Sequence, residues 1–385
     1  MKRFFDLIFS LVPDGIRTAL SPVGARCCAF FGALVPRERR IVALAGASLL
    51  VALLVLGVRE RIRGSERPWF APYVNVTAVP AYPFEERGVV PSGNAVLAFV
   101  VASEDDPCEP SWGGYYSMDE TAETLALDDR IDEFRHRGGR IAVSFGGAKG
   151  DELSTVCEDP TSLRLAYRSV IDRYGIRTLD FDLEGENLDD HDAMRRRADA
   201  LAELQEEYGE GREELFIWLT LPVSPSGIGE KGRLAVRTML DAGVELAGVN
   251  VMTMNYGAGR AEGGNMAETS GRALVAAERD LAESYEGVGI DGEPDDFRDM
   301  LGATPMIGRN DTEGDIFTLG DAETLNGLAR ETGLARLSLW SAERDRPCDD
   351  GSGRKNASSS CSGTDEESEA FSEVLGRGYA GRIPE

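Results

Sequence analysis

The feature that most limits the fold is a regular alternation of short apolar runs and helix-like segments between residues 70 and 342. Several runs are apolar almost throughout, which is typical of parallel strands covered on both faces. The eight expected strands are 70–77, 95–102, 140–147, 176–184, 215–222, 248–256, 303–310 and 336–342. Helix-like segments lie near 120–137, 161–174, 191–209, 231–243, 267–284 and 320–333, with a last one near 366–377. This alternation predicts an α/β fold, a single (β/α)8 TIM barrel over residues 68–385.

A second feature precedes the barrel. Residues 41–58 (IVALAGASLLVALLVLGV) form an apolar run of 18 residues without charge or proline, at the short end of what spans a ~30 Å hydrocarbon core. Arginines flank both ends and 40 residues come first, which favours an uncleaved anchor over a cleaved signal peptide. We therefore expect a cytoplasmic segment (1–40), a single transmembrane helix (41–58), a tether (59–67) and an extracellular barrel at the cell membrane.

Charge and histidine content exclude several functions. The chain carries 41 Lys and Arg against 67 Asp and Glu, a formal net charge of -26, which argues against nucleic-acid binding. The two histidines, His136 and His191, stand in polar helical stretches, so neither a histidine triad nor a metal site is expected. The sequence G-x-x-x-x-G-K-[ST] of a phosphate-binding loop does not occur. We expect no metal and no cofactor.

Four of the six cysteines follow the apolar run, at positions Cys108, Cys157, Cys348 and Cys361. In a domain outside the cell they favour two disulfides, for which three pairings are possible. The short intervening loop favours Cys348–Cys361, which leaves Cys108–Cys157 as the other pair. The alternative is four free, buried thiols.

The residues that indicate chemistry lie in the segment LDFDLE (179–184). On a strand, Asp180, Asp182 and Glu184 share one face, and in a barrel that face points inward with Glu184 nearest the catalytic rim. Three carboxylates in a low-dielectric interior cannot all ionise cheaply, so one should hold a proton near neutral pH. A protonated carboxyl at the rim is what glycosidic-bond cleavage requires. The alternative is a solvated acidic strand end.

This segment resembles the D-G-x-D-x-D-x-E signature of family 18 glycoside hydrolases, the chitinase family. The D-x-D-x-E core is complete, whereas Arg177 and Thr178 stand where the first Asp and the Gly are usual. Other segments similar to family motifs are present in the right order along the chain: SFGG (144–147) before this segment, and VNVMTMNY (249–256), PMIG (305–308) and LWS (339–341) after it. The likeness covers roughly residues 69–345 and is nearest to actinobacterial members.

The resemblance implies a retaining, substrate-assisted hydrolysis of β-1,4-linked N-acetylglucosamine polymers. Glu184 would be the general acid. Asp182 would orient the 2-acetamido group and stabilise the cation that its oxygen forms at C1. Asp180 would hold Asp182 by sharing a proton or a hydrogen bond. Tyr256 would point into the pocket and contact the acetamido group.

Further residues are candidates for substrate binding. Trp340 would form an apolar floor under the scissile sugar, the alternative being a core tryptophan. Met254 shares a strand face with Tyr256, and Asn255 replaces an aspartate usual in the family. Gly146 belongs to the SFGG motif. Trp112 would supply a sugar-binding edge in a glycine-rich loop, or pack beside the Cys108 disulfide.

Other functions remain open on this scaffold. One is an endo-β-N-acetylglucosaminidase acting on glycans or the cell wall. Another is a catalytically silent chitin- or glycan-binding protein, because a fold does not fix a function. The intact carboxylate row favours hydrolysis, while Arg177, Thr178 and the changed strand-six motif keep the silent alternative open. The expected partners are a polysaccharide or glycan containing N-acetylglucosamine and, through residues 41–58, a membrane.

Overall fold

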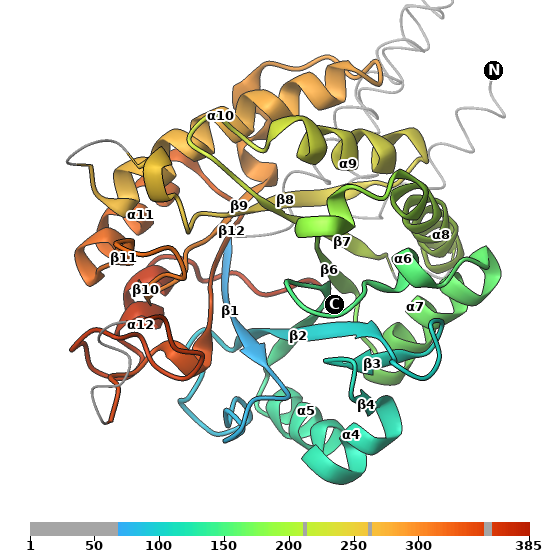
Figure 1. Cartoon of the computed structure of the whole chain (residues 1–385), viewed down its shortest axis with the longest axis horizontal. Helices are drawn as coiled ribbons and strands as arrows, with labels where there is room; N and C mark the ends of the chain where they lie inside the picture. Colours follow the sequence, from blue (N-terminus) through green and yellow to red (C-terminus); the bar gives the residue numbers. More distant parts are fainter. Residues whose placement is uncertain (1–67, 211–213, 261–263, 350–355) are drawn as a thin grey trace, which may run out of the picture. The chain divides into compact units, whose positions relative to one another are not determined.

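The first barrel strand, β1 (Trp69–Asn75), pairs in parallel with both β2 (Asn94–Ala102) and β12 (Arg336–Leu339). Through this double pairing the order β1-β12-β9-β8-β7-β6-β5-β2 returns to its start and closes an eight-stranded parallel barrel (Figure 1). The remaining strands are β5 (Arg140–Gly146), β6 (Thr178–Asp182), β7 (Phe216–Pro222), β8 (Leu246–Met252) and β9 (Leu301–Thr304). The computed structural model describes residues 68–210, 214–260, 264–349 and 356–385. The predicted barrel is confirmed.

Helices surround the strands on the outside of the barrel (Figure 1). They are α4 (Met118–Leu125), α5 (Leu127–His136), α6 (Leu153–Val156), α7 (Pro160–Tyr174), α8 (His191–Glu210), α9 (Gly229–Asp241), α10 (Met266–Glu286), α11 (Leu319–Thr332) and α12 (Ala370–Gly376). The predicted helix 120–137 is split in two, because Ala126 adopts a left-handed conformation with φ 50°. The other predicted helices are present.

Short 3-10 turns and short strands lie in the loops between the barrel strands and the helices. The described residues include the 3-10 turns η1 (Gly185–Leu188), η2 (Gly257–Gly259), η3 (Pro294–Met300) and η4 (Ala342–Arg344). Strands β3 (Pro110–Trp112) and β4 (Tyr116–Ser117) extend β2 in antiparallel fashion, and β10 (Gly308–Arg309) pairs with β11 (Ile316–Phe317) as a hairpin. The loops that carry η1, η2, η4 and the β10–β11 hairpin all follow the carboxyl ends of barrel strands, where active sites of such barrels lie.

Side chains of the barrel strands point alternately into the barrel and outward against the helices. Residues that point outward from the strands, such as Phe145, Phe181 and Leu219, are fully buried against the helices in the larger apolar core. A smaller apolar cluster, which includes Trp69, Tyr73, Trp218 and Ile383, fills the inside of the barrel. Because neighbouring positions on a strand face opposite ways, the polar residues of each strand are directed into this inner space.

Both favoured disulfides are present. Cys108 bonds to Cys157, which joins the loop after β2 to the end of α6 across 49 residues. Cys348 bonds to Cys361 across 13 residues, in the polar segment that follows β12. The pairing predicted from the short loop is therefore confirmed.

The predicted N-terminal segments, 1–40, 41–58 and 59–67, lie outside the described residues. Within the described part of the chain, no helix has the length and apolar character needed to cross a membrane.

Candidate active site

The three predicted carboxylates lie along β6 and at its carboxyl end. Asp180 and Asp182 belong to the strand, and Glu184 comes directly before η1. Phe181 and Leu183, the intervening residues, are fully buried in the outer core, so the acidic residues face the barrel interior. Asp180 is completely buried, Asp182 is 6% exposed and Glu184 is half-buried. Burial therefore falls along the row towards the rim, as the alternation predicted.

Asp180 is held by four hydrogen-bond donors from four other strands. Its Oδ2 accepts from the Tyr73 hydroxyl (2.8 Å) and the Ser144 hydroxyl (2.7 Å). Its Oδ1 accepts from the Thr220 hydroxyl (2.7 Å) and from Arg336 Nη1 (2.6 Å). These four donors occupy both oxygens of the carboxyl group. Asp180 is thereby fixed as an anchor of the barrel interior.

Asp182 differs from its neighbour in that it lacks a comparable set of donors. Its Oδ1 is buried and has no hydrogen-bond partner among the described residues. Burial raises the pKa of Asp182 well above its usual range, the negative charges of Glu184 and Asp180 raise it further, and Arg336 opposes them. The proton or hydrogen bond shared between Asp180 and Asp182 stays a prediction.

Glu184 has the properties expected of a carboxyl that keeps its proton. Burial raises its pKa, and the negative charge of Asp311 raises it further. Asp311 lies in the turn between β10 and β11, and Asn255 forms hydrogen bonds to the residues on either side of Asp311. The Asn255 backbone N–H donates to Asn310 Oδ1 (3.0 Å), and its own Oδ1 accepts from the Thr312 N–H (3.0 Å). Asn255 thus supports the loop that carries Asp311.

Tyr256 lies elsewhere than predicted. It follows the end of β8 and is buried in the outer core, where its hydroxyl is 3.2 Å from Ser270 Oγ on α10. The chain leaves the strand geometry at Met252, so the strand alternation no longer sets the direction of this side chain. The hydroxyl therefore faces α10 rather than the carboxylate row. Met254, also beyond the strand end, is half-buried.

Trp340 and Phe99 form an aromatic pair at the rim. Their rings stack with centroids 5.4 Å apart and an interplanar angle of 26°, and Tyr73 meets Trp340 edge-on at 6.0 Å. Both members of the pair are half-buried. Trp340 is thus not a fully buried core tryptophan. Phe99 was not predicted, because it lies within a run of apolar residues that reads as uniform core.

Two other candidates have packing roles. Trp112 is completely buried and its indole N–H donates to the Tyr174 hydroxyl (2.9 Å), so it does not form an exposed sugar-binding edge. Gly146 has a φ of 94°, and a Cβ there would stand 2.3 Å from the backbone oxygen of Asp182. Gly146 therefore permits the close approach of β5 to β6, which fixes the backbone of the carboxylate row.

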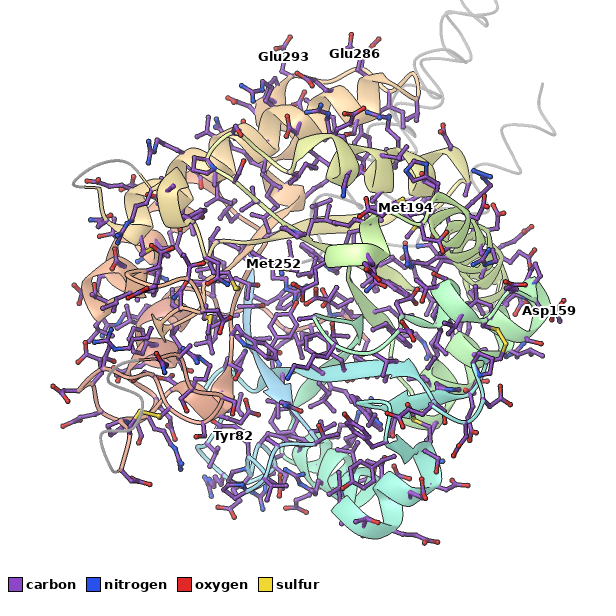
Figure 2. The ribbon with its side chains drawn as sticks, in the orientation of Figure 1. Tyr82, Asp159, Met194, Met252, Glu286 and Glu293 are labelled. Carbon is purple, nitrogen blue, oxygen red and sulfur yellow. A yellow bond between two sulfur atoms is a disulfide. The ribbon has the colours of Figure 1, made fainter. Side chains whose placement is uncertain are left out.

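Met252, the last residue of β8, is labelled near the middle of Figure 2, whereas Asp159, Glu286 and Glu293 are labelled near its edge. The two histidines are exposed on helices. No group of three or more His, Cys, Asp or Glu that could hold a metal ion occurs among the described residues. The candidate site itself presents carboxyl groups, Asp182 and Glu184, and the aromatic pair Phe99 and Trp340.

The chain is similar in sequence to known proteins, although no protein-family model matches it. The probable bifunctional chitinase/lysozyme of Escherichia coli (strain K12) is 32% identical over 305 residues, and endochitinase 11 of Metarhizium anisopliae is 30% identical over 305 residues. Each match covers 76% of this chain, which spans 33% of the first relative and 56% of the second.

A solved structure decides the family. The catalytic domain of the hyperthermophilic chitinase from Pyrococcus furiosus is 30% identical, with a TM-score of 0.68, over 80% of this chain and 94% of that one. The chain belongs to family 18 of the glycoside hydrolases, the chitinase family. The resemblance predicted from the D-x-D-x-E segment is therefore confirmed. Family 18 membership also accounts for a barrel whose acidic residues line one strand and end at the rim.

Proposed function

We propose that this chain is a chitinase-type hydrolase that cleaves β-1,4-linked N-acetylglucosamine polymers with retention of configuration. The observation that carries the proposal is the row of acids at β6. Glu184, at the rim, has a raised pKa, and the buried Asp182 stands beside it on the same face of the strand. A proton donor next to a second carboxyl group is what substrate-assisted cleavage needs. The names of the similar proteins from Escherichia coli, Metarhizium anisopliae and Pyrococcus furiosus support chitin as the substrate class.

In this mechanism Glu184 gives its proton to the glycosidic oxygen as the bond from that oxygen to C1 breaks. The oxygen of the substrate's own 2-acetamido group forms a bond to C1, so no protein nucleophile is required. Asp182 accepts a hydrogen bond from the acetamido N–H and stabilises the positive charge that develops on that group. The Glu184 carboxylate then takes a proton from a water molecule, which attacks C1 and restores the acetamido group. Phe99 and Trp340 would provide the apolar surface under the sugar.

The cellular location is part of the same proposal. We place the barrel outside the cell, held by the apolar run 41–58. The disulfides Cys108–Cys157 and Cys348–Cys361 support an oxidising compartment. Protease added to intact cells should degrade the barrel while an epitope at residues 1–40 stays protected. Protection of both parts would contradict the orientation.

The catalytic assignment is tested with the full chain and a fluorogenic chito-oligosaccharide. Glu184→Gln should lower kcat by about 10²–10⁴-fold, because it removes the proton donor and keeps the shape. Glu186→Gln, the same change at an exposed position two residues along, serves as the matched control and should keep full activity. Activity that is indifferent to Glu184 would contradict the mechanism.

The alternatives have distinct outcomes in the same assay. A folded wild-type chain that binds chito-oligosaccharides without turnover would be a silent glycan-binding protein. Release of intact glycans from glycoproteins, with chito-oligosaccharides left uncut, would indicate an endo-β-N-acetylglucosaminidase instead. Turnover of chito-oligosaccharides supports the proposal made here.

A further inference from the structure

Arg344 is a buried arginine at the end of η4, the turn that follows Trp340, and it is 1% exposed. Burial lowers the pKa of Arg344 to about 10, and the negative charge of Asp311 opposes this effect. Arg344 is therefore charged at neutral pH. A buried charge is tolerated only where polar partners surround it, and the partners of Arg344 are backbone carbonyl groups.

The guanidinium group of Arg344 joins three segments of the chain. Its Nη2 donates to the backbone oxygens of Ile307 (2.7 Å) and Arg309 (2.6 Å), which lie directly before β10 and within it. Its Nη1 donates to the backbone oxygen of Ser358, in the disulfide-bonded segment after β12. The planar fork of an arginine can serve several acceptors at once. Arg344 thus ties the β10–β11 hairpin to η4 and to that segment.

The hairpin is packed tightly at its base and loosely at its tip. At the base, the Arg309 N–H donates to the backbone oxygen of Ser362 (2.8 Å), and a Cβ at Gly308 would collide with the same oxygen. At the tip, Asp311 and Asn356 are among the residues that line a cavity of about 390 Å³. Side-chain packing therefore leaves room for the tip to move, and its position depends on the hydrogen bonds that hold the hairpin.

Asp311, in the turn of the hairpin, acts on the candidate site through its charge. This negative charge raises the pKa of Glu184, and it also raises the pKa of Arg344. Asp311 is therefore within electrostatic range of both groups. The interaction between two charges weakens as the distance between them grows. The position of the hairpin thus affects how tightly Glu184 holds its proton.

We propose that Arg344 is a positioning residue for the hydrolysis, which holds the β10–β11 hairpin so that Asp311 stays within range of Glu184. Without its guanidinium group, the carbonyl groups of Ile307 and Arg309 lose this donor. Buried carbonyl groups that lose a donor favour a rearrangement towards water, and the hairpin would move with them. The inference rests on the proposed function for its catalytic consequence, but the protonation of Glu184 can be measured without turnover.

The sign of the effect separates a positioning role from a purely electrostatic one. Removal of a positive charge, with nothing moved, would favour the protonated form of a nearby acid and so raise the pKa of Glu184. Movement of Asp311 away from Glu184 would lower that pKa. The alkaline limb of kcat/KM reports the loss of the Glu184 proton, so the two roles move this limb in opposite directions. General destabilisation would lower activity and leave the limb in place.

The experiment measures kcat/KM against pH for the wild-type full chain, Arg344→Gln, Asp311→Asn and the double variant. Arg344→Gln should move the alkaline limb to lower pH, by no more than Asp311→Asn does. The double variant should have its limb where Asp311→Asn alone has it, because Arg344 acts through Asp311. Arg346→Gln, the same change at an exposed arginine two residues along, is the matched control and should leave the limb in place. A limb that stays or moves to higher pH in Arg344→Gln, or a further shift in the double variant, would overturn the inference.

Arg344→Lys replaces Arg344→Gln if the glutamine variant does not fold. The lysine keeps the positive charge, but its ammonium group lacks the planar fork that serves both carbonyl groups of the hairpin. A shift of the alkaline limb to lower pH would then come from movement of the hairpin, because the charge is retained. An unchanged limb in this variant would overturn the inference.

The titration of Glu184 provides a readout that needs no turnover. The carboxyl ¹³C signal of Glu184 in glutamate-labelled protein, identified by its absence from Glu184→Gln, is followed against pH. The pKa of Glu184 should be lower in the Arg344 variant and in Asp311→Asn than in the wild type. A pKa that does not fall in the Arg344 variant would overturn the inference. A wild-type chain without turnover in which these pKa changes still occur would refute the proposed function alone.

Discussion

Glu343 is a buried acid whose ionisation should set how stability depends on pH. It lies in η4 after Trp340 and is 6% exposed. Its Oε1 accepts from the Asn75 backbone N–H (2.7 Å), whereas Oε2 is buried without a hydrogen-bond partner among the described residues. Burial raises the pKa of Glu343 from 4.5 to about 7. The folded protein thus holds this proton more tightly than the unfolded chain does.

The sign and size of the effect follow from linkage between folding and protonation. A raised folded-state pKa contributes stability that is fully present below pH 4.5 and is lost as the pH rises through about 7. The interval of about 2.5 pH units corresponds to ~3 kcal/mol of unfolding free energy. Glu343→Gln removes the titration and keeps the shape and the acceptor for Asn75. The variant should therefore gain ~3 kcal/mol on the wild type between pH 4.5 and pH 8.5.

The assay is equilibrium urea unfolding of the full chain, followed by tryptophan fluorescence at both pH values. The four tryptophans of the sequence all lie in the described barrel, so the signal reports its unfolding. Glu323→Gln makes the same chemical change at an exposed site on α11 and should give no difference between the two pH values. A wild-type-to-variant difference for Glu343→Gln that is the same at pH 4.5 and pH 8.5 would refute the reasoning.

Three further changes test other parts of the site and fold. Asp311→Asn removes a negative charge that raises the pKa of Glu184, so the alkaline limb of kcat/KM should move to lower pH; a limb that stays in place would contradict this role. Trp340→Ala should weaken chito-oligosaccharide binding by about tenfold, ~1.4 kcal/mol, in calorimetric titrations, and an unchanged Kd would argue against the aromatic floor. Replacing both Cys108 and Cys157 by Ser opens a 49-residue loop and should cost ~4 kcal/mol in urea unfolding, with a loss below ~1 kcal/mol counting against the disulfide.

Much of the fold could be predicted because it depends on local patterns. The same strand and helix periodicities recur in each strand–helix pair, so small errors at the ends of these elements do not change the predicted barrel. The position of Asp180, Asp182 and Glu184 on one inward face followed from the alternation of a single strand. The Cys348–Cys361 bond followed from the shortness of its loop.

The rest of the site depends on contacts between residues far apart in the chain. Asp180 pairs with Arg336 across 156 positions, and no local pattern indicates that pairing. Asp311 affects Glu184 from a loop whose path Asn255 fixes, so its effect appears only in three dimensions. The predicted direction of the Tyr256 side chain was wrong because the alternation of strand residues was extended past the end of β8, where the backbone turns.

The position of β12 in the chain determines when the active site is completed during synthesis. It is the last barrel strand along the chain, it begins with Arg336, and it leads directly into Trp340. A ribosome that has made the chain as far as β9 has therefore produced Asp180, Asp182 and Glu184 without Arg336, the ion-pair partner of Asp180, and without Trp340. Domains are synthesised from the N-terminus at ~5–20 residues per second, so this interval is brief but real. The barrel should therefore close and become catalytically active at the same stage of synthesis. A nascent chain should not cleave a polymer before it can bind one.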